Sequence, residues 1–92
     1  MLAQCDSLTS IVIPNSVTTI SPYAFFNCPS LSKVDIPNSV MEIGTYAFGT
    51  CNSIADITFN GTIAQWNAIE KNIWRDSFLA TYVQCSDGQV AL

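Results

Sequence analysis

The sequence predicts a repeat solenoid, mainly β with short irregular and 3-10 segments, that ends in a C-terminal cap of one helix and one β-hairpin. Three observations predict this fold. A 23-residue unit recurs without gaps, each copy carries the alternating apolar pattern of a half-buried strand, and the chain departs from the unit after residue 59. Hydrophobic residues make up 49% of the 92 residues and charged residues 11%, which favours a folded chain over a disordered one.

The repeat is seen by aligning residues 5–27 with residues 28–50. Both segments are 23 residues long, and they are identical at 12 positions. Residues 51–59 begin a third, partial copy, and residues 1–4 look like the tail of a preceding one. A single unit cannot bury its apolar face alone, so the units are expected to stack and to form one continuous core. We therefore assign residues 1–59 to the repeats.

Each unit predicts a strand followed by a turn. The pattern L-x-x-L-x-L is matched at Leu8, Ile11 and Ile13, and its last two apolar positions have the period-two spacing of a strand. Pro14 and Asn15 then favour a turn, because proline lacks an N–H group and asparagine tolerates turn conformations. Stacked units should align equivalent residues of parallel strands in ladders. The expected ladders are Leu8/Leu31/Ile54, Ile11/Val34/Ile57 and Ile13/Ile36/Phe59.

The second half of each unit is expected to return along the opposite side of the coil. Val17 and Ile20, repeated as Val40 and Ile43, supply the apolar positions of this return path. The Tyr-Ala-Phe sequence that follows in each copy is expected to fill the wide end of the coil.

Three cysteines share one position of the unit. Cys5, Cys28 and Cys51 lie at intervals of 23 residues, which is not the C-x-x-C spacing of zinc sites, and the chain has no histidine. No metal site is therefore predicted. We expect a ladder of small buried hydrophobic residues, in which the parallel Cβ directions disfavour disulfides between adjacent coils. Cys85 lies outside this register.

The motif C-x-S-L-x-x-V-x-I-P-N-S-V-x-x-I-x-x-Y-A-F resembles the BspA-type leucine-rich repeat, a bacterial surface subclass. The resemblance covers residues 2–59, and the segments FNGTIAQWNAI and YVQCSDG resemble the C-terminal end of such arrays. It implies a leucine-rich-repeat-like solenoid from a bacterial cell-surface or secreted protein, although the first residues have no signal-peptide pattern. It also implies a role in adhesion, with a host extracellular or cell-surface protein as the partner.

Residues 60–92 are assigned to the cap. Thr62 and Gln65 have the spacing of a capping box, and apolar residues follow at helical spacing, which predicts a helix over residues 63–72. The apolar face of this helix is expected to cover the open end of the last coil. An Asp-Gly pair at 87–88 predicts the turn of a hairpin over residues 81–92.

The two tryptophans of the cap allow two interpretations. Trp66 and Trp74 are expected to plug the end of the core, since the terminal unit of a solenoid must cover it. The alternative is that one of them is exposed and stacks on a sugar ring.

Charge and residue types exclude several classes of function. The three cations, Lys33, Lys71 and Arg75, stand against seven acidic residues, for a net charge of −4. No basic face for nucleic acid or for an anionic membrane is therefore expected, and no apolar run is long enough to cross a bilayer. The sequence contains no histidine, no nucleophile–base set, no phosphate loop and no metal cluster, so we predict neither an enzyme nor a cofactor.

The outward positions of the parallel strands are the candidate protein-binding face. Such faces bind ligands in solenoid proteins, and these positions differ between the copies while most core positions agree. Three strands would span only about 10 Å, so we expect the isolated chain to bind weakly or not at all. An ordinary solvated face is the alternative. The candidate residues are Ser10, Val12, Lys33, Asp35, Asp56 and Thr58.

The main hypothesis is a non-enzymatic protein-interaction module with a role in adhesion to host proteins or to other cells. A passive structural spacer or capping domain is the first alternative. Carbohydrate binding through Trp66 or Trp74 is the second. The sequence predicts no cap at the N-terminal coil. Three consequences are open: more repeats precede this coil in the native protein, two copies self-associate through it, or its edge frays.

Overall fold

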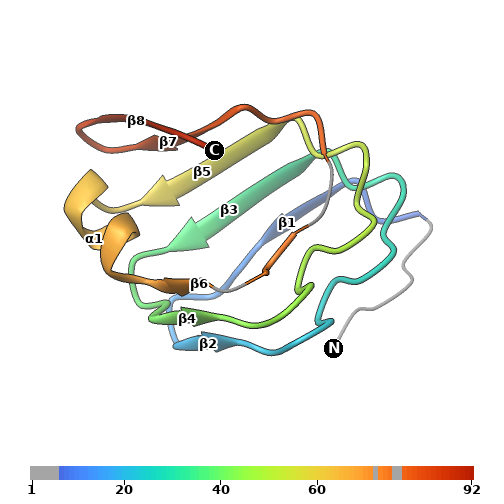
Figure 1. The fold of residues 1–92 in the computed structure, drawn as a ribbon, viewed down its shortest axis with the longest axis horizontal. Coiled ribbons are helices and arrows are strands. Elements are labelled where there is room, and N and C mark those ends of the chain that lie inside the picture. The colour runs from blue at the N-terminus through green and yellow to red at the C-terminus, as the bar shows by residue number, and fades with distance from the viewer. Residues whose placement is uncertain (1–6, 72, 76–77) are drawn as a thin grey trace.

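The chain winds in successive coils, with one β-sheet along each of two sides of a shared core (Figure 1). The computed structural model describes residues 7–71, 73–75 and 78–92. Its elements are β1 (Ser10–Val12), β2 (Thr19–Ile20), β3 (Lys33–Pro37), β4 (Glu42–Ile43), β5 (Asp56–Asn60), α1 (Ile63–Ala68), β6 (Glu70–Lys71), β7 (Tyr82–Cys85) and β8 (Gly88–Ala91).

The larger sheet has five strands in the order β1-β3-β5-β7-β8, and the smaller has three in the order β2-β4-β6. All pairs are parallel except β7 with β8. On the third side of the coil, which contains the Tyr-Ala-Phe sequences, backbone hydrogen bonds also join neighbouring coils. The amide of Phe25 donates to the carbonyl of Ala47 at 2.7 Å, and the amide of Phe48 donates to that of Trp74 at 3.0 Å. The predicted β-solenoid is therefore confirmed.

The core ladders have the register that the repeat predicts. Ile11 pairs with Val34 and Val34 with Ile57, while Ile36 pairs with Phe59. Because each strand lies beside its own copy, the repeat length of 23 residues sets this register. Leu31 and Ile54, the inner members of the remaining ladder, are also buried.

The cysteine ladder is confirmed at two of its three positions. Cys28 and Cys51 are fully buried thiols, and the Cys51 sulfur lies 2.9 Å from the carbonyl oxygen of Phe25. Cys85, which is off this register, is buried as well. Cys5 and the predicted partial repeat at residues 1–4 lie outside the described residues.

The wide end of the coil is filled by phenylalanine and alanine, not by tyrosine. The rings of Phe25 and Phe48 stack with centroids 5.2 Å apart, and Ala24 beside them is buried. Tyr23 is 48% exposed. The prediction that the whole Tyr-Ala-Phe sequence packs inside is wrong for tyrosine. Tyr23 and Tyr46 adopt the left-handed conformation (φ 60° and 51°), at which the chain bends. Tyr46 is half-buried, and its ring centroid lies 5.9 Å from that of Tyr23.

Thr50 holds a backbone conformation that its side chain disfavours. Its φ of 53° lies in the left-handed region, where a β-branched residue is strained. Asn27 occupies the same position of the preceding coil with φ 60°, and asparagine tolerates this conformation. We expect Thr50→Asn to raise the free energy of unfolding by about 0.5–1 kcal/mol. Urea unfolding followed by circular dichroism measures this change in the free energy of unfolding. The reciprocal Asn27→Thr should lower the value, and equal stability of both variants would contradict the argument.

The helix begins where predicted and ends earlier. The Thr62 hydroxyl accepts from the Gln65 amide at 3.1 Å, and the Gln65 side-chain oxygen accepts from the Thr62 amide at 3.0 Å, which completes the capping box. The helix ends at Ala68, so its predicted extension to residue 72 is wrong. Ile69 is extended, and the chain enters β6, which pairs with β4. The helix therefore forms the corner of a coil, between β5 and β6.

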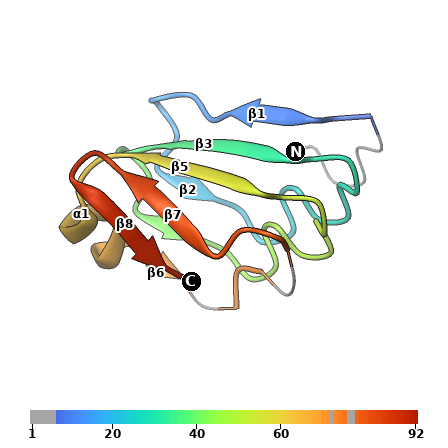
Figure 2. The same ribbon diagram turned by 90° about the horizontal axis from the view of Figure 1, so that it is seen from above.

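The predicted hairpin is present, and its first strand also extends the parallel sheet. Thr58 on β5 pairs with Gln84 on β7, and β8 then returns along β7 at the edge of the sheet (Figure 2). The return strand starts at Gly88, directly after the turn residue Asp87. An Asp87 carboxylate oxygen accepts from the amide of Ile63 at 2.8 Å and holds the hairpin turn against the start of the helix. The division into repeats at 1–59 and a cap at 60–92 stays a prediction.

Candidate functional site

The six predicted outward residues lie in two rows across the larger sheet. One row contains Ser10, Lys33 and Asp56, which pair directly between neighbouring strands. The other row aligns in the same way and consists of Val12, Asp35 and Thr58. Lys33 and Asp56 are therefore neighbours on adjacent coils, as the repeat predicts. Their role in binding stays a prediction.

Two further strands widen this face. Gln84 continues the second row beside Thr58, and Gln89 on β8 follows Gln84. Tyr82, two residues before Gln84 and 45% exposed, lies on the same side and pairs with Ala91. We call the outward side of the five strands the strand face. It consists of Ser10, Val12, Lys33, Asp35, Asp56, Thr58, Tyr82, Gln84, Gln89 and Ala91.

Sequence reasoning missed the cap's share of the strand face. Val83 and Cys85 are buried while Tyr82 and Gln84 are exposed, so the segment alternates with period two. This alternation was a usable signal for which side chains face outward. It carries no information on which strand β7 joins. With five strands, the strand face spans about 19 Å between its outer strand axes, against the about 10 Å expected for three.

The strand face is polar and partly held in place by its own hydrogen bonds. It carries one cation, Lys33, and two carboxylates, Asp35 and Asp56. The side-chain amide of Gln84 donates to the backbone carbonyl of Cys85 at 2.9 Å. The side-chain amide of Gln89 donates to the side-chain oxygen of Gln84 at 3.1 Å. These bonds orient two side-chain amides before any partner arrives, which lowers the entropy lost on binding.

Both tryptophans are core residues. Trp66 is 1% exposed and Trp74 is 7% exposed, with ring centroids 5.8 Å apart. The ring of Phe59 packs against that of Trp66 with centroids 5.4 Å apart, and the ring of Phe48 packs against that of Trp74 with centroids 6.0 Å apart. The predicted plug of the core end is confirmed. Sugar binding through these residues is wrong, because a buried ring offers no face on which a sugar can stack.

Lys71 and Cys85 in the cap have shifted pKa values. The ammonium of Lys71 donates to the carbonyls of Trp66 at 2.8 Å and Ile69 at 3.1 Å, and it lies 4.7 Å from the Trp66 ring centroid. Burial lowers the pKa of Lys71. Burial and then the nearby Asp87 carboxylate raise the pKa of the Cys85 thiol, which keeps it protonated and poorly nucleophilic.

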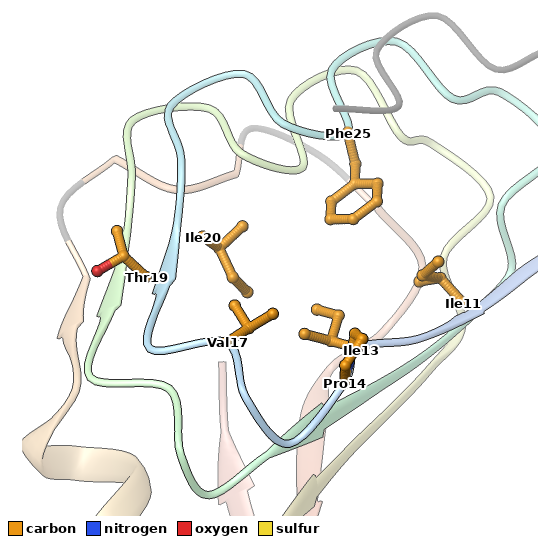
Figure 3. A pocket seen from close by; sticks show the side chains of 7 residues that line it. All are labelled: Ile11, Ile13, Pro14, Val17, Thr19, Ile20 and Phe25. Carbon is orange, nitrogen blue, oxygen red and sulfur yellow. The ribbon is translucent and has the colours of Figure 1, made fainter.

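A hollow opens at the side of the first coil that faces away from β3 and β4. Its volume is about 290 Å³, and side chains of β1, β2 and the turn between them line it together with Phe25 (Figure 3). A smaller hollow of about 170 Å³ lies between Met41 and the helix.

Within residues 7–71, 73–75 and 78–92, no group of three or more acidic, cysteine or histidine side chains is placed to hold a metal ion. None of the helical structure described is long and apolar enough to cross a membrane.

Comparisons with known proteins agree with this fold. A family model described as "BspA type Leucine rich repeat region (6 copies)" matches residues 1–87. A leucine rich cell surface protein from Faecalibacterium prausnitzii A2-165, known from its crystal structure, is 43% identical with a TM-score of 0.72. That match covers 74% of this chain and 18% of the other, so the chain spans a small part of that protein's length. No curated protein matches the chain. The chain belongs to the BspA-type leucine-rich repeat family.

Proposed function

We propose that the chain is a non-enzymatic protein-interaction module and that the strand face is its binding surface. Its parent is a bacterial cell-surface or secreted protein that adheres to host proteins or to other cells. Membership of a leucine-rich repeat family supports the interaction role, and the cell-surface description of the structurally similar protein supports the location.

One observation carries the proposal. Five strands present two rows of exposed or half-exposed side chains whose identity changes from coil to coil, while the core beneath them repeats. Lys33 and Asp35 stand where the preceding coil has Ser10 and Val12, yet the inward Ile13 and Ile36 are the same. A repeated core with a varied exterior is the arrangement by which solenoids present a specific surface on a uniform scaffold.

The size of the strand face limits its affinity. A patch about 19 Å wide and about five residues long covers on the order of 300 Å², below the roughly 800 Å² per partner of a standard interface. The chain alone should therefore bind weakly, and an array with more coils should bind more tightly. Tight binding by the 92 residues alone would overturn this argument.

Charge reversal on the strand face tests the proposal. A longer array that ends in this chain is tested against a printed panel of purified extracellular and cell-surface proteins, and the Kd of each hit is measured by biolayer interferometry. We expect Lys33→Glu with Asp35→Lys to weaken binding about tenfold or more, because interfacial charges set partner choice. The free energy of unfolding should fall by no more than about 1 kcal/mol, because Lys33 is exposed and Asp35 half-buried, and the loss comes from a carboxylate at position 33 opposite Asp56 on β5.

Glu42→Lys provides the matched control, since Glu42 is an exposed charge on the other sheet of the same coil. It should leave the Kd unchanged. If both variants bind like the unchanged array, the strand face is not the binding surface. If no panel protein binds any array, the passive spacer is the better explanation.

A further inference from the structure

The cap adds one exposed aromatic ring to the strand face. Tyr82 on β7 is 45% exposed, whereas both tryptophans of the cap are buried. Its neighbour on β8 is Ala91, whose methyl group is too short to cover a phenol ring. Figure 2 shows β7 and β8 beside β5 in the same sheet. Tyr82 therefore presents an apolar ring to solvent among the polar side chains of the strand face.

Close to this ring, two side-chain amides are fixed in place. The Gln84 amide nitrogen donates to the carbonyls of Cys85 at 2.9 Å and Gly88 at 3.2 Å, and its oxygen accepts from the Gln89 amide at 3.1 Å. A glutamine amide has two N–H groups and one oxygen. Within the described residues, the second N–H group and the oxygen of Gln89 have no partner. Gln89 therefore offers one donor and one acceptor in an orientation that is set before a ligand arrives.

A carboxylate lies on the other side of the ring. Thr58 on β5 pairs with Gln84 in the parallel sheet, and Asp56 and Tyr82 each lie two residues before this pair. Residues two apart on a strand share a face, so Asp56 and Tyr82 are neighbours on the outer side of the sheet. Asp56 is exposed, and its carboxylate can only accept hydrogen bonds. We call Asp56, Tyr82, Gln84 and Gln89 the cap patch.

We propose that the cap patch binds a neutral hexopyranose, the terminal sugar of a cell-surface glycan. A pyranose ring has an apolar C–H face and a rim of hydroxyl groups, each of which can donate and accept. The C–H face stacks on Tyr82, the Gln89 amide bonds two adjacent hydroxyls, and the Asp56 carboxylate accepts from a third. This inference rests on the proposed function, because it assigns a ligand class to one end of the strand face.

The size and charge of the cap patch favour a neutral sugar over other ligands. Four strand positions cover about 100–150 Å², far below the roughly 800 Å² that a protein partner needs, but enough for one sugar ring. The Asp56 carboxylate, in a chain of net charge −4, repels sialylated and sulfated sugars. So small a contact predicts a Kd in about the millimolar range.

Nuclear magnetic resonance of the side-chain amides tests the proposal. The 15N-labelled chain is titrated with the methyl glycosides of β-galactose, β-glucose and α-mannose, each to about 50 mM. We expect at least one sugar to shift the side-chain amide signals of Gln84 and Gln89 and to saturate. Tyr82→Leu keeps an apolar side chain without a flat ring and should raise the Kd about fivefold to tenfold. Tyr82→Phe keeps the ring and should bind like the unchanged chain.

Tyr23→Leu is the matched control, because Tyr23 is 48% exposed but lies on the third side of the coil. It should leave the Kd unchanged. Circular dichroism confirms that each variant is folded. If Tyr82→Leu is not, Gln89→Ala replaces it and should raise the Kd about threefold or more.

Two results would overturn the inference: no saturable shift with any of the three sugars, or equal weakening by Tyr23→Leu and Tyr82→Leu. Loss of protein binding on charge reversal at Lys33 and Asp35 would still support the proposed function in either case. Sugar binding by a chain whose longer array binds no panel protein would give the opposite outcome. The failures of the two proposals are therefore distinguishable.

Discussion

Replacing Trp66 with alanine should lower the free energy of unfolding by about 3–5 kcal/mol, the largest effect that we expect from a single change in this chain. The indole is 1% exposed and lies between the rings of Phe59 and Trp74. Its removal leaves a cavity at the end of a small core that has no second layer to collapse into it. The Lys71 ammonium also loses the ring over which it lies.

Urea unfolding followed by far-ultraviolet circular dichroism measures this loss. Tyr82→Ala is a suitable control, because it also removes an aromatic ring from the cap but at a position that is 45% exposed. The Tyr82→Ala control should lower the free energy of unfolding by less than about 1 kcal/mol. If the two variants have the same stability, Trp66 does not plug the core.

Gly44→Ala should lower the free energy of unfolding by about 2–3 kcal/mol. A methyl group at Gly44 would lie 2.5 Å from the backbone nitrogen of Pro22 and 2.8 Å from its Cα atom. These are backbone atoms of the neighbouring coil, held in place by the hydrogen bond from the Gly44 amide to the carbonyl of Ile20 at 2.8 Å. The coils would have to separate, which strains the hydrogen bonds between them.

Ser21→Ala is the control, since Ser21 occupies the same position of the first coil and already carries a Cβ atom. Its stability should change by less than about 0.5 kcal/mol. Both values come from the midpoint and slope of the urea transition. A Gly44→Ala chain as stable as the unchanged one would mean that the coils lie further apart than the structure shows.

The strands of the first two coils show why part of this fold could be predicted. Val34 packs between Ile11 and Ile57 because identical units stack in register, so the 23-residue repeat also specifies the contacts. Period-two alternation then decided which residues of each strand face outward, Lys33 and Asp35 among them. Both inferences need only local pattern and the rule that a coil buries its apolar side against the next one.

The tyrosines illustrate a local failure of the same reasoning. Tyr23 is apolar enough to be placed in the core, and its neighbour Phe25 is indeed there. A left-handed residue bends the chain, and neither the repeat nor the hydrophobicity of the sequence reveals where such a residue occurs. Side-chain direction at such a bend depends on backbone angles that the hydrogen bonds of the neighbouring coil impose.

By itself, the sequence determined the solenoid, its register, the buried cysteines at 28 and 51 and the capping box at Thr62. Only the tertiary structure decided that the helix stops at Ala68 and that β7 joins β5 through Thr58 and Gln84. The physical reason is the same in both cases. After Phe59 no repeated copy specifies the neighbour, so strand pairing depends on contacts between dissimilar segments far apart in the chain. The cap's half of the strand face, Tyr82, Gln84, Gln89 and Ala91, follows from those contacts alone.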